Sequence, residues 1–157
     1  MAKAAAKEET KGIEMENKIE KMTQFLAENK IECFDVQKIE DVNHTTIFRS
    51  RMEVKGQLLP MALLMDDSVY MLLQVQIAPQ VIDEEKLKAL AGAINNMNNN
   101  VRPFKFTVSE KGDLMLNACI TAENNTFNPA LTNAIMGEVV KFLDDQYGNI
   151  MEAVWGK

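Results

Sequence analysis

Few side chains in this 157-residue sequence are suited to nucleophilic or acid–base chemistry. It contains one histidine, His44, and two cysteines, Cys33 and Cys119. A thiol beside an imidazole is the arrangement of a cysteine nucleophile, so Cys33 and His44 are candidates for a catalytic or small-molecule site. One histidine and one nearby thiol are too few ligands for a zinc site. The more ordinary interpretation is a loop histidine and free, half-buried thiols.

Carboxylates are plentiful, but their positions favour structural roles. Asp66 and Asp67 lie in a sequence typical of a turn and lack the ligand series of a calcium loop. Other acidic pairs fall in expected caps and on solvated helix faces, where nothing buries a carboxylate for acid–base work. Glycine-rich phosphate loops and the G-x-S-x-G motif are absent from the sequence. We therefore predict no catalytic residue, no metal ligand, no cofactor and no enzymatic activity.

Composition and charge narrow the class of protein. Hydrophobic residues make up 46% and charged residues 25%, as in ordinary globular proteins. The net charge of −6, without a cluster of Lys and Arg, argues against a nucleic-acid partner. The chain has no apolar run of about 18 residues and no secretory signal at its start, so we expect a cytoplasmic protein without a membrane partner.

The first half of the sequence predicts a helix followed by a meander. Residues 1–12 are rich in Ala, Lys and Glu and are expected to form a flexible tail, with 13–157 as a single domain. A helical period runs from Ile13 to about Asn29. A short strand is expected at 34–39, and three antiparallel strands follow within 45–78. Pro60 predicts that its strand lies at an edge or carries a bulge there.

The second half predicts a helix, a hairpin and a last helix. Asp83 is the expected N-cap of the second helix, and the hairpin spans about 103–121. Asn128 and Pro129 should begin the last helix, which Tyr147 and Gly148 end or bend. The apolar stripes expected to face the core are Leu87, Leu90, Ile94 and Met97, then Leu131, Ile135, Val139, Phe142 and Leu143. The fold class is α+β: helix, three strands, helix, two strands, helix, with helices packed on an antiparallel-rich sheet.

The stretch "INNMNNNVRPFKFTVSEKGDLMLNACI" is the most distinctive in the chain. Its asparagines lie where the second helix must stop, and Asn tolerates the backbone of helix ends and satisfies orphan carbonyls. We assign Asn95 and Asn98 as structural residues that join this helix to the hairpin, with Gly112 at the hairpin turn. Substituting Asn98 should therefore change stability more than binding.

The same stretch resembles the signature of YbjN-type proteins, in which an asparagine pair ends the second helix before a hairpin with a glycine turn. Here Asn95, Asn98 and Gly112 carry the resemblance, and "NNTFNPALTNAIMGEVV" is similar to the family's last helix cap. The match is sharp over about 94–140, although Met97 replaces a frequent aromatic residue. The resemblance implies a fold like that of class I type III secretion chaperones, and a small acidic homodimer without enzymatic activity that handles other proteins.

Apolar residues on the expected outward face of the sheet give the best functional indication. An antiparallel sheet with one wet face alternates more cleanly than this sequence does. The outward face should therefore be covered, either by the chain's own helices, by a dimer partner or by a client protein. The residues that we predict to bind a partner are Leu58, Leu64, Tyr70, Leu72 and Met115.

Three functional hypotheses follow. The first is a homodimeric protein-interaction module, chaperone-like or regulatory, that binds an unidentified protein client. The second is a small-molecule-binding protein or an enzyme that uses Cys33 and His44. The third is a dedicated type III secretion chaperone, which genes for an effector and a secretion apparatus nearby would indicate.

Overall fold

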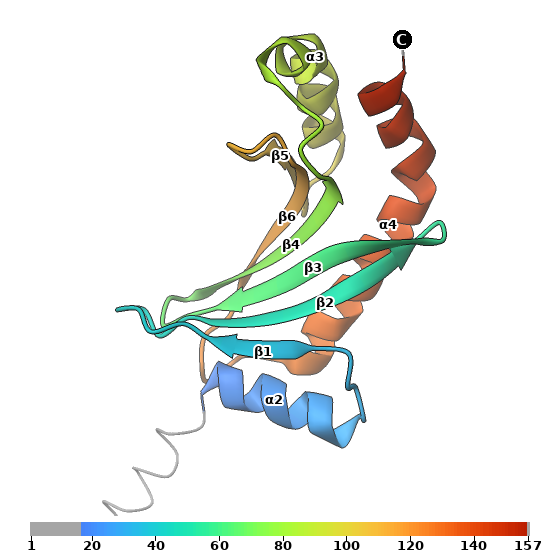
Figure 1. The fold of residues 1–157 in the computed structure, drawn as a ribbon. Helices are drawn as coiled ribbons and strands as arrows, with labels where there is room; N and C mark the ends of the chain where they lie inside the picture. The colour runs from blue at the N-terminus through green and yellow to red at the C-terminus, as the bar shows by residue number, and fades with distance from the viewer. Residues whose placement is uncertain (1–16, 157) are drawn as a thin grey trace, which may run out of the picture.

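The structure is a computed structural model that describes residues 17–156, so the predicted tail lies outside the described residues. It is an α+β fold in which helices pack on one six-stranded antiparallel sheet of order β1-β2-β3-β4-β6-β5 (Figure 1). The chain forms α2 (Lys18–Glu28), β1 (Asp35–Lys38), β2 (Thr46–Val54), β3 (Gln57–Met65), β4 (Tyr70–Ala78), α3 (Glu84–Asn100), β5 (Lys105–Val108), β6 (Leu114–Thr121) and α4 (Pro129–Trp155). The predicted fold class is confirmed, and the short strand expected at 34–39 is β1.

Period-two alternation sets the faces of the strands. Phe48 and Met52 of β2 are buried, whereas Arg49 and Arg51 are exposed. Lys55 and Gly56 join β2 to β3 with φ of 50° and 77°, and two positive values are typical of a tight hairpin turn. Such a turn fixes the register, and a fixed register keeps every apolar side chain on its face.

Capping residues fix where the helices begin. The side chains of Asn17, Asp83 and Asn128 accept hydrogen bonds from the backbone N–H groups of Glu20, Lys86 and Leu131, respectively, so the predicted caps of α3 and α4 are confirmed. Asn17 has extended backbone at φ −90° and ψ 172°. The predicted first helix is present as α2 from Lys18, and its expected beginning at 13–16 lies outside the described residues.

The core lies between one face of the sheet and two helices. Met22 and Leu26 of α2 and Val139 and Leu143 of α4 are buried against the inward strand residues. In Figure 1 α4 crosses behind the strands, and its main sheet contact is with β2. No described helix covers the opposite face, which we call the outward face.

Three expectations about the helices and strands need correction or refinement. The predicted end or bend at Tyr147 does not stop α4, which continues to Trp155. The stripe of α3 faces the core without being fully buried: Leu90, Ile94 and Met97 are partly buried against it, whereas Leu87 is 40% exposed. Pro60 lies in a central strand, but pairing of β3 with β4 ends at Met61, so the strand is an edge locally. None of the helices within residues 17–156 combines the length and apolar character needed to cross a bilayer.

Candidate functional site: an apolar row and an open strand edge

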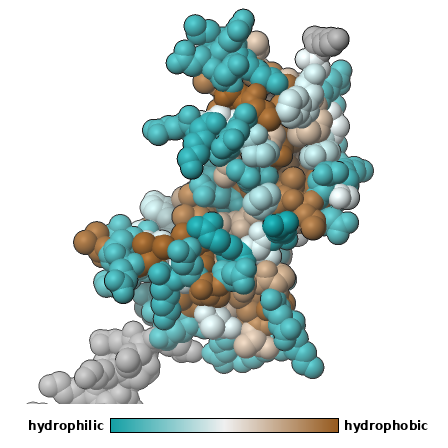
Figure 2. All heavy atoms as spheres, in the orientation of Figure 1, coloured by the Kyte–Doolittle hydropathy of each residue, from teal (hydrophilic) through white to brown (hydrophobic). Residues whose placement is uncertain are grey.

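Four strands place one line of apolar side chains across the outward face. The register pairs Ile47 with Leu64, Leu64 with Leu72, and Leu72 with Cys119. Directly opposed residues of antiparallel strands point to the same face, so these side chains are contiguous. Ile47, Leu64 and Leu72 are half-buried and Cys119 is exposed. We call these four residues the apolar row; Figure 2 shows hydrophobic atoms reaching the surface over the strands among polar ones.

The structure brings together only some of the predicted partner-binding residues. Leu64 and Leu72 belong to the apolar row, and Tyr70, which is 53% exposed, lies beside Leu72 on β4. Leu58 is 59% exposed near the β2–β3 turn, and Met115 is half-buried near the start of β6. The last two residues are separated from each other by β4, so they do not extend the row.

Beside the apolar row, on the side of Leu58 and Met115, runs a second row that we call the polar row because it is polar on every strand except β3. Arg49 pairs with Ala62, Ala62 with Gln74, and Gln74 with Asn117. The Asn117 amide donates to Thr107 Oγ1 at 2.6 Å, which carries the polar row on to β5. On β4 and β6 the apolar surface is therefore narrower than the sequence pattern predicts, whereas on β3 Pro60 and Ala62 connect Leu58 with Leu64.

The apolar row ends at a strand edge that no described residue pairs. β6 has eight residues but β5 has only four, and their pairing ends at Lys105↔Asn117. Residues 118–121 of β6 therefore have β4 on one side and no strand on the other. Unpaired edges of this kind present backbone groups to a further strand.

Hydrogen bonds on either side of β6 show which residues face the open edge. The N–H of Ala122 donates to the carbonyl of Val69, so even-numbered residues face β4. The N–H and C=O of Phe106 bind Asn98 and therefore point away from β6. The backbone groups of Lys105 and Thr107 then point toward β6, where they pair with the odd-numbered Asn117 and Met115. Because alternate residues of a strand point their backbone groups to opposite sides, Cys119 and Thr121 present N–H and C=O at the open edge.

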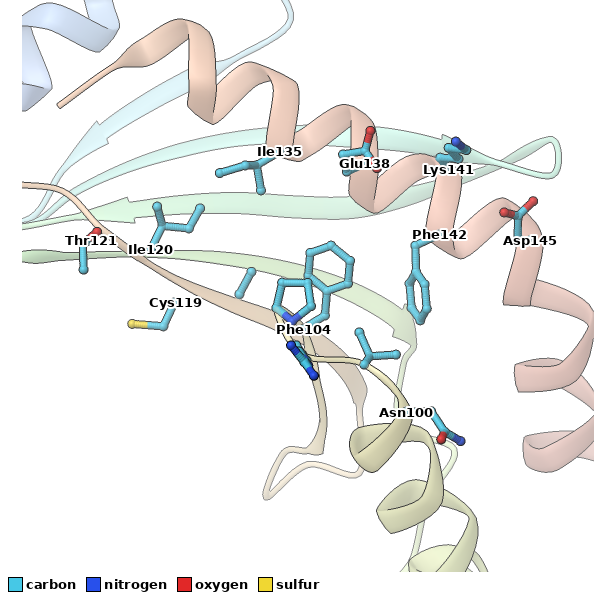
Figure 3. A pocket seen from close by; sticks show the side chains of 14 residues that line it. Asn100, Phe104, Cys119, Ile120, Thr121, Ile135, Glu138, Lys141, Phe142 and Asp145 are labelled. Carbon is cyan, nitrogen blue, oxygen red and sulfur yellow. The ribbon is translucent and has the colours of Figure 1, made fainter.

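A groove of about 1000 Å³ adjoins this edge on the inward side (Figure 3). It exists because α4 packs mainly on β2 and leaves the inward face of β6 partly uncovered. Ile120 and Ile135 line the end near Thr121, while Phe104 and Phe142 line the other end with ring centroids 5.4 Å apart. The charged residues of its lining are Arg102, Glu138, Lys141 and Asp145.

One asparagine of the distinctive stretch closes the other side of β5. The Asn98 Oδ1 atom accepts from the Phe106 N–H at 2.6 Å, and its Nδ2 donates to the Phe106 carbonyl at 3.1 Å. The Lys105 ammonium binds the carbonyls of Asn98 and Val101 at 2.8 and 2.9 Å. Asn95 is exposed and makes no side-chain hydrogen bond within the described residues. The structural role therefore belongs to Asn98 of the predicted pair.

Gly112 occupies the hairpin turn as expected. Its φ is 86°, and its carbonyl accepts hydrogen bonds from the N–H groups of Val81 and Ile82 at 3.1 Å each. A Cβ at this position would overlap the Ile82 carbonyl. The turn thus ties the β5–β6 hairpin to the segment that leads into α3.

The candidate catalytic pair is not assembled. Cys33 precedes β1 and His44 follows it, so the two lie at opposite ends of that strand. Both cysteines are exposed and unpaired, rather than half-buried as predicted. Across residues 17–156 no three His, Cys, Asp or Glu side chains group as a metal site would require.

His44 instead pairs with a carboxylate of the turn between β3 and β4. Its Nδ1 lies 2.5 Å from Asp67 Oδ2, and this hydrogen bond and charge raise the pKa of His44. Asp66 Oδ1 accepts from the Ser68 N–H at 2.9 Å, which is ordinary turn chemistry. The side chains of His44 and Asp67 are 77% and 62% exposed, so we assign their contact to the structure of the turn rather than to a buried reactive site.

Known proteins add no family assignment. A comparison with models of protein families finds none that matches this chain. A comparison with curated protein sequences finds no relative. The resemblance to YbjN-type proteins accordingly stays a prediction.

Sequence reasoning missed the groove because it assigned its wall to the core. Ile135 and Phe142 share the helical period of the buried Val139 and Leu143, so periodicity alone does not separate groove residues from core residues. The available signal was the unequal length of the hairpin arms. Residues 114–121 alternate for longer than 105–108, and a shorter partner strand leaves part of β6 unpaired.

Proposed function

We propose that this chain is a non-enzymatic protein-interaction module, chaperone-like or regulatory, that works as a homodimer. The apolar row on the outward face is the surface on which a protein partner docks. The cytoplasm is its proposed location, in keeping with the composition and charge of the chain.

The apolar row is the observation that supports this proposal most strongly. Four adjacent strands contribute to it, and no described helix covers it. A contiguous apolar surface on a soluble protein is typical of a site for another protein. Tyr70 at its border adds the kind of half-exposed aromatic residue that interfaces favour.

The three-plus-two order of the main strands agrees with the chaperone-like fold that the YbjN-type resemblance implies, and this agreement lends the proposal some support. A dedicated role in type III secretion has no such observation behind it. Neither has catalysis, because Cys33 and His44 lie apart.

Affinity capture with a matched pair of variants tests the proposal. Leu72→Asp puts a charge in the middle of the apolar row, and Gln76→Asp puts the same charge on the same strand and face outside it. Wild-type protein and Gln76→Asp should form a dimer by light scattering and retain the same captured proteins. Leu72→Asp should lose both while it still unfolds in one cooperative thermal transition, at a somewhat lower temperature because packing and the dimer contacts are lost.

The proposal would be contradicted if wild type, Gln76→Asp and Leu72→Asp captured the same proteins and had the same molecular mass in solution. Thermal melting is the control for folding, because a half-buried position such as Leu72 contributes some packing. A Leu72→Asp protein that melts normally and still dimerises would assign the interface elsewhere.

A further inference from the structure

We propose that the open edge of β6 and the adjoining groove bind a short extended peptide segment of a partner protein. The segment adds as a strand beside Cys119 and Thr121, with side chains in the groove. This inference rests on the proposed function as a protein-interaction module and names a second site, separate from the centre of the apolar row.

Backbone chemistry identifies the ligand as extended polypeptide. Cys119 and Thr121 each present one N–H donor and one C=O acceptor in the plane of the sheet, spaced two residues apart. Another strand matches this alternating pattern, since its own donors and acceptors recur every two residues. Strand addition at an exposed edge is an established way in which proteins bind peptides.

The groove specifies the side chains of the peptide. An added strand points every second side chain to the same face as Ala118 and Ile120, which is the face that opens into the groove. The wall and floor there include Ile120, Ile135, Phe104 and Phe142. In Figure 3 the Cys119 side chain points away from α4, so the intervening residues of the peptide lie on the outward face. We expect apolar residues at alternate positions of the ligand.

The small size of the site favours a peptide over a second copy of the chain. Pairing of β6 with itself across a two-fold axis would set Cys119 opposite Thr121 and make about four hydrogen bonds. A stable dimer buries about 800 Å² on each subunit, whereas a short peptide fills a groove of about 1000 Å³.

Selection from a displayed library of random nine-residue peptides tests the inference. The enriched peptides should carry apolar residues at every second position. One of them is then synthesised with a fluorophore, together with a twin whose edge-facing amides are N-methylated and cannot donate. Fluorescence anisotropy should show saturable binding of the first peptide and at least tenfold weaker binding of the twin.

Two glutamate substitutions on α4 provide the matched variants. Ile135→Glu places a carboxylate in the groove, whereas Leu131→Glu places it one turn earlier, at an exposed position outside the groove lining. Ile135→Glu should weaken peptide binding at least tenfold and Leu131→Glu less than twofold. Amide NMR signals of Cys119 and Thr121 should shift on titration of the wild-type protein.

Several results would overturn the inference. These are the absence of any enriched peptide, equal binding of the methylated twin, or NMR shifts confined to Ile47, Leu64 and Leu72. Cys119 and Thr121 signals that change with protein concentration in Leu72→Asp, in which the apolar row no longer supports a dimer, would assign the edge to a second copy. Binding that appears only after removal of residues 1–16 would assign it to the chain's own N-terminal segment. Dimerisation through the apolar row is measured separately with Leu72→Asp and Gln76→Asp. Failure of the peptide-binding inference can therefore be distinguished from failure of the proposed function.

Discussion

Asn98 performs with one side chain the task that a neighbouring strand performs elsewhere in the sheet. Its amide oxygen and nitrogen bind the N–H and C=O of Phe106, which is the pattern of one residue in an antiparallel ladder. The Phe106 groups on the outer edge of β5 are thereby satisfied without a seventh strand. Residues 118–121 of β6, beyond the end of β5, have no such partner within the described residues.

Replacing Asn98 with leucine should cost about 2 kcal/mol in the free energy of unfolding, because it leaves both backbone groups of Phe106 without a partner. Urea denaturation at constant m-value measures the loss. Asn95→Leu, an exposed position on the same helix, should change stability by less than about 0.5 kcal/mol. Equal losses in the two variants would contradict the role assigned to Asn98.

The type of residue was predictable here but the individual residue was not. Asparagine at a helix end indicates a structural role from the sequence alone. Which amide reaches Phe106 depends on how α3 crosses β5, and that crossing is a tertiary property. In the same way, Cys33 and His44 were reasonable partners by type, and only the path of β1 separates them.

The hairpin of unequal arms is the element that creates the candidate peptide site. β5 ends its pairing early because the chain leaves α3 at Asn100 and enters the strand at Lys105, opposite Asn117. The position of the hairpin is then fixed by Gly112, whose carbonyl binds the backbone of Val81 and Ile82. We therefore expect that destabilising the turn at Gly112 also destabilises the β5–β6 hairpin and the open edge of β6.

Gly112→Ala should destabilise the fold by about 3 kcal/mol or more. The positive φ strains any residue with a Cβ, and relief of the overlap with Ile82 breaks two backbone hydrogen bonds. Gly56→Ala is the matched control, because its φ is also positive at 77° but its surroundings are open. It should lose only about 1–2 kcal/mol. Chemical denaturation compares them, and a loss at Gly56 as large as at Gly112 would contradict this account of the turn.

Strands were easier to predict than helix faces. Alternation of Phe48, Met52 and their neighbours determined both faces of β2, since a strand has only two sides. A helix has a continuous circumference, so the stripe of α4 merged groove residues such as Ile135 with core residues such as Val139. The stripe of α3 likewise predicted burial, yet Leu87 remains 40% exposed.

At the scale of the whole molecule, the sheet has one face covered by its own helices and one face that is not. The sequence indicated that both faces are apolar, and it left open whether helices or a partner cover the second. α2 and α4 both pack on the inward face, so the chain does not cover the apolar row itself within residues 17–156. Shielding by a second polypeptide is the physical expectation that follows.

Sedimentation velocity over a range of protein concentrations tests this expectation most directly. The wild-type protein should sediment with about twice the monomer mass of 17.7 kDa at micromolar concentration, and Leu72→Asp should sediment as a folded monomer. Gln76→Asp should behave as wild type. A single 17.7 kDa species at every concentration, alike in all three proteins, would contradict the claim that a second copy of the chain covers the apolar row.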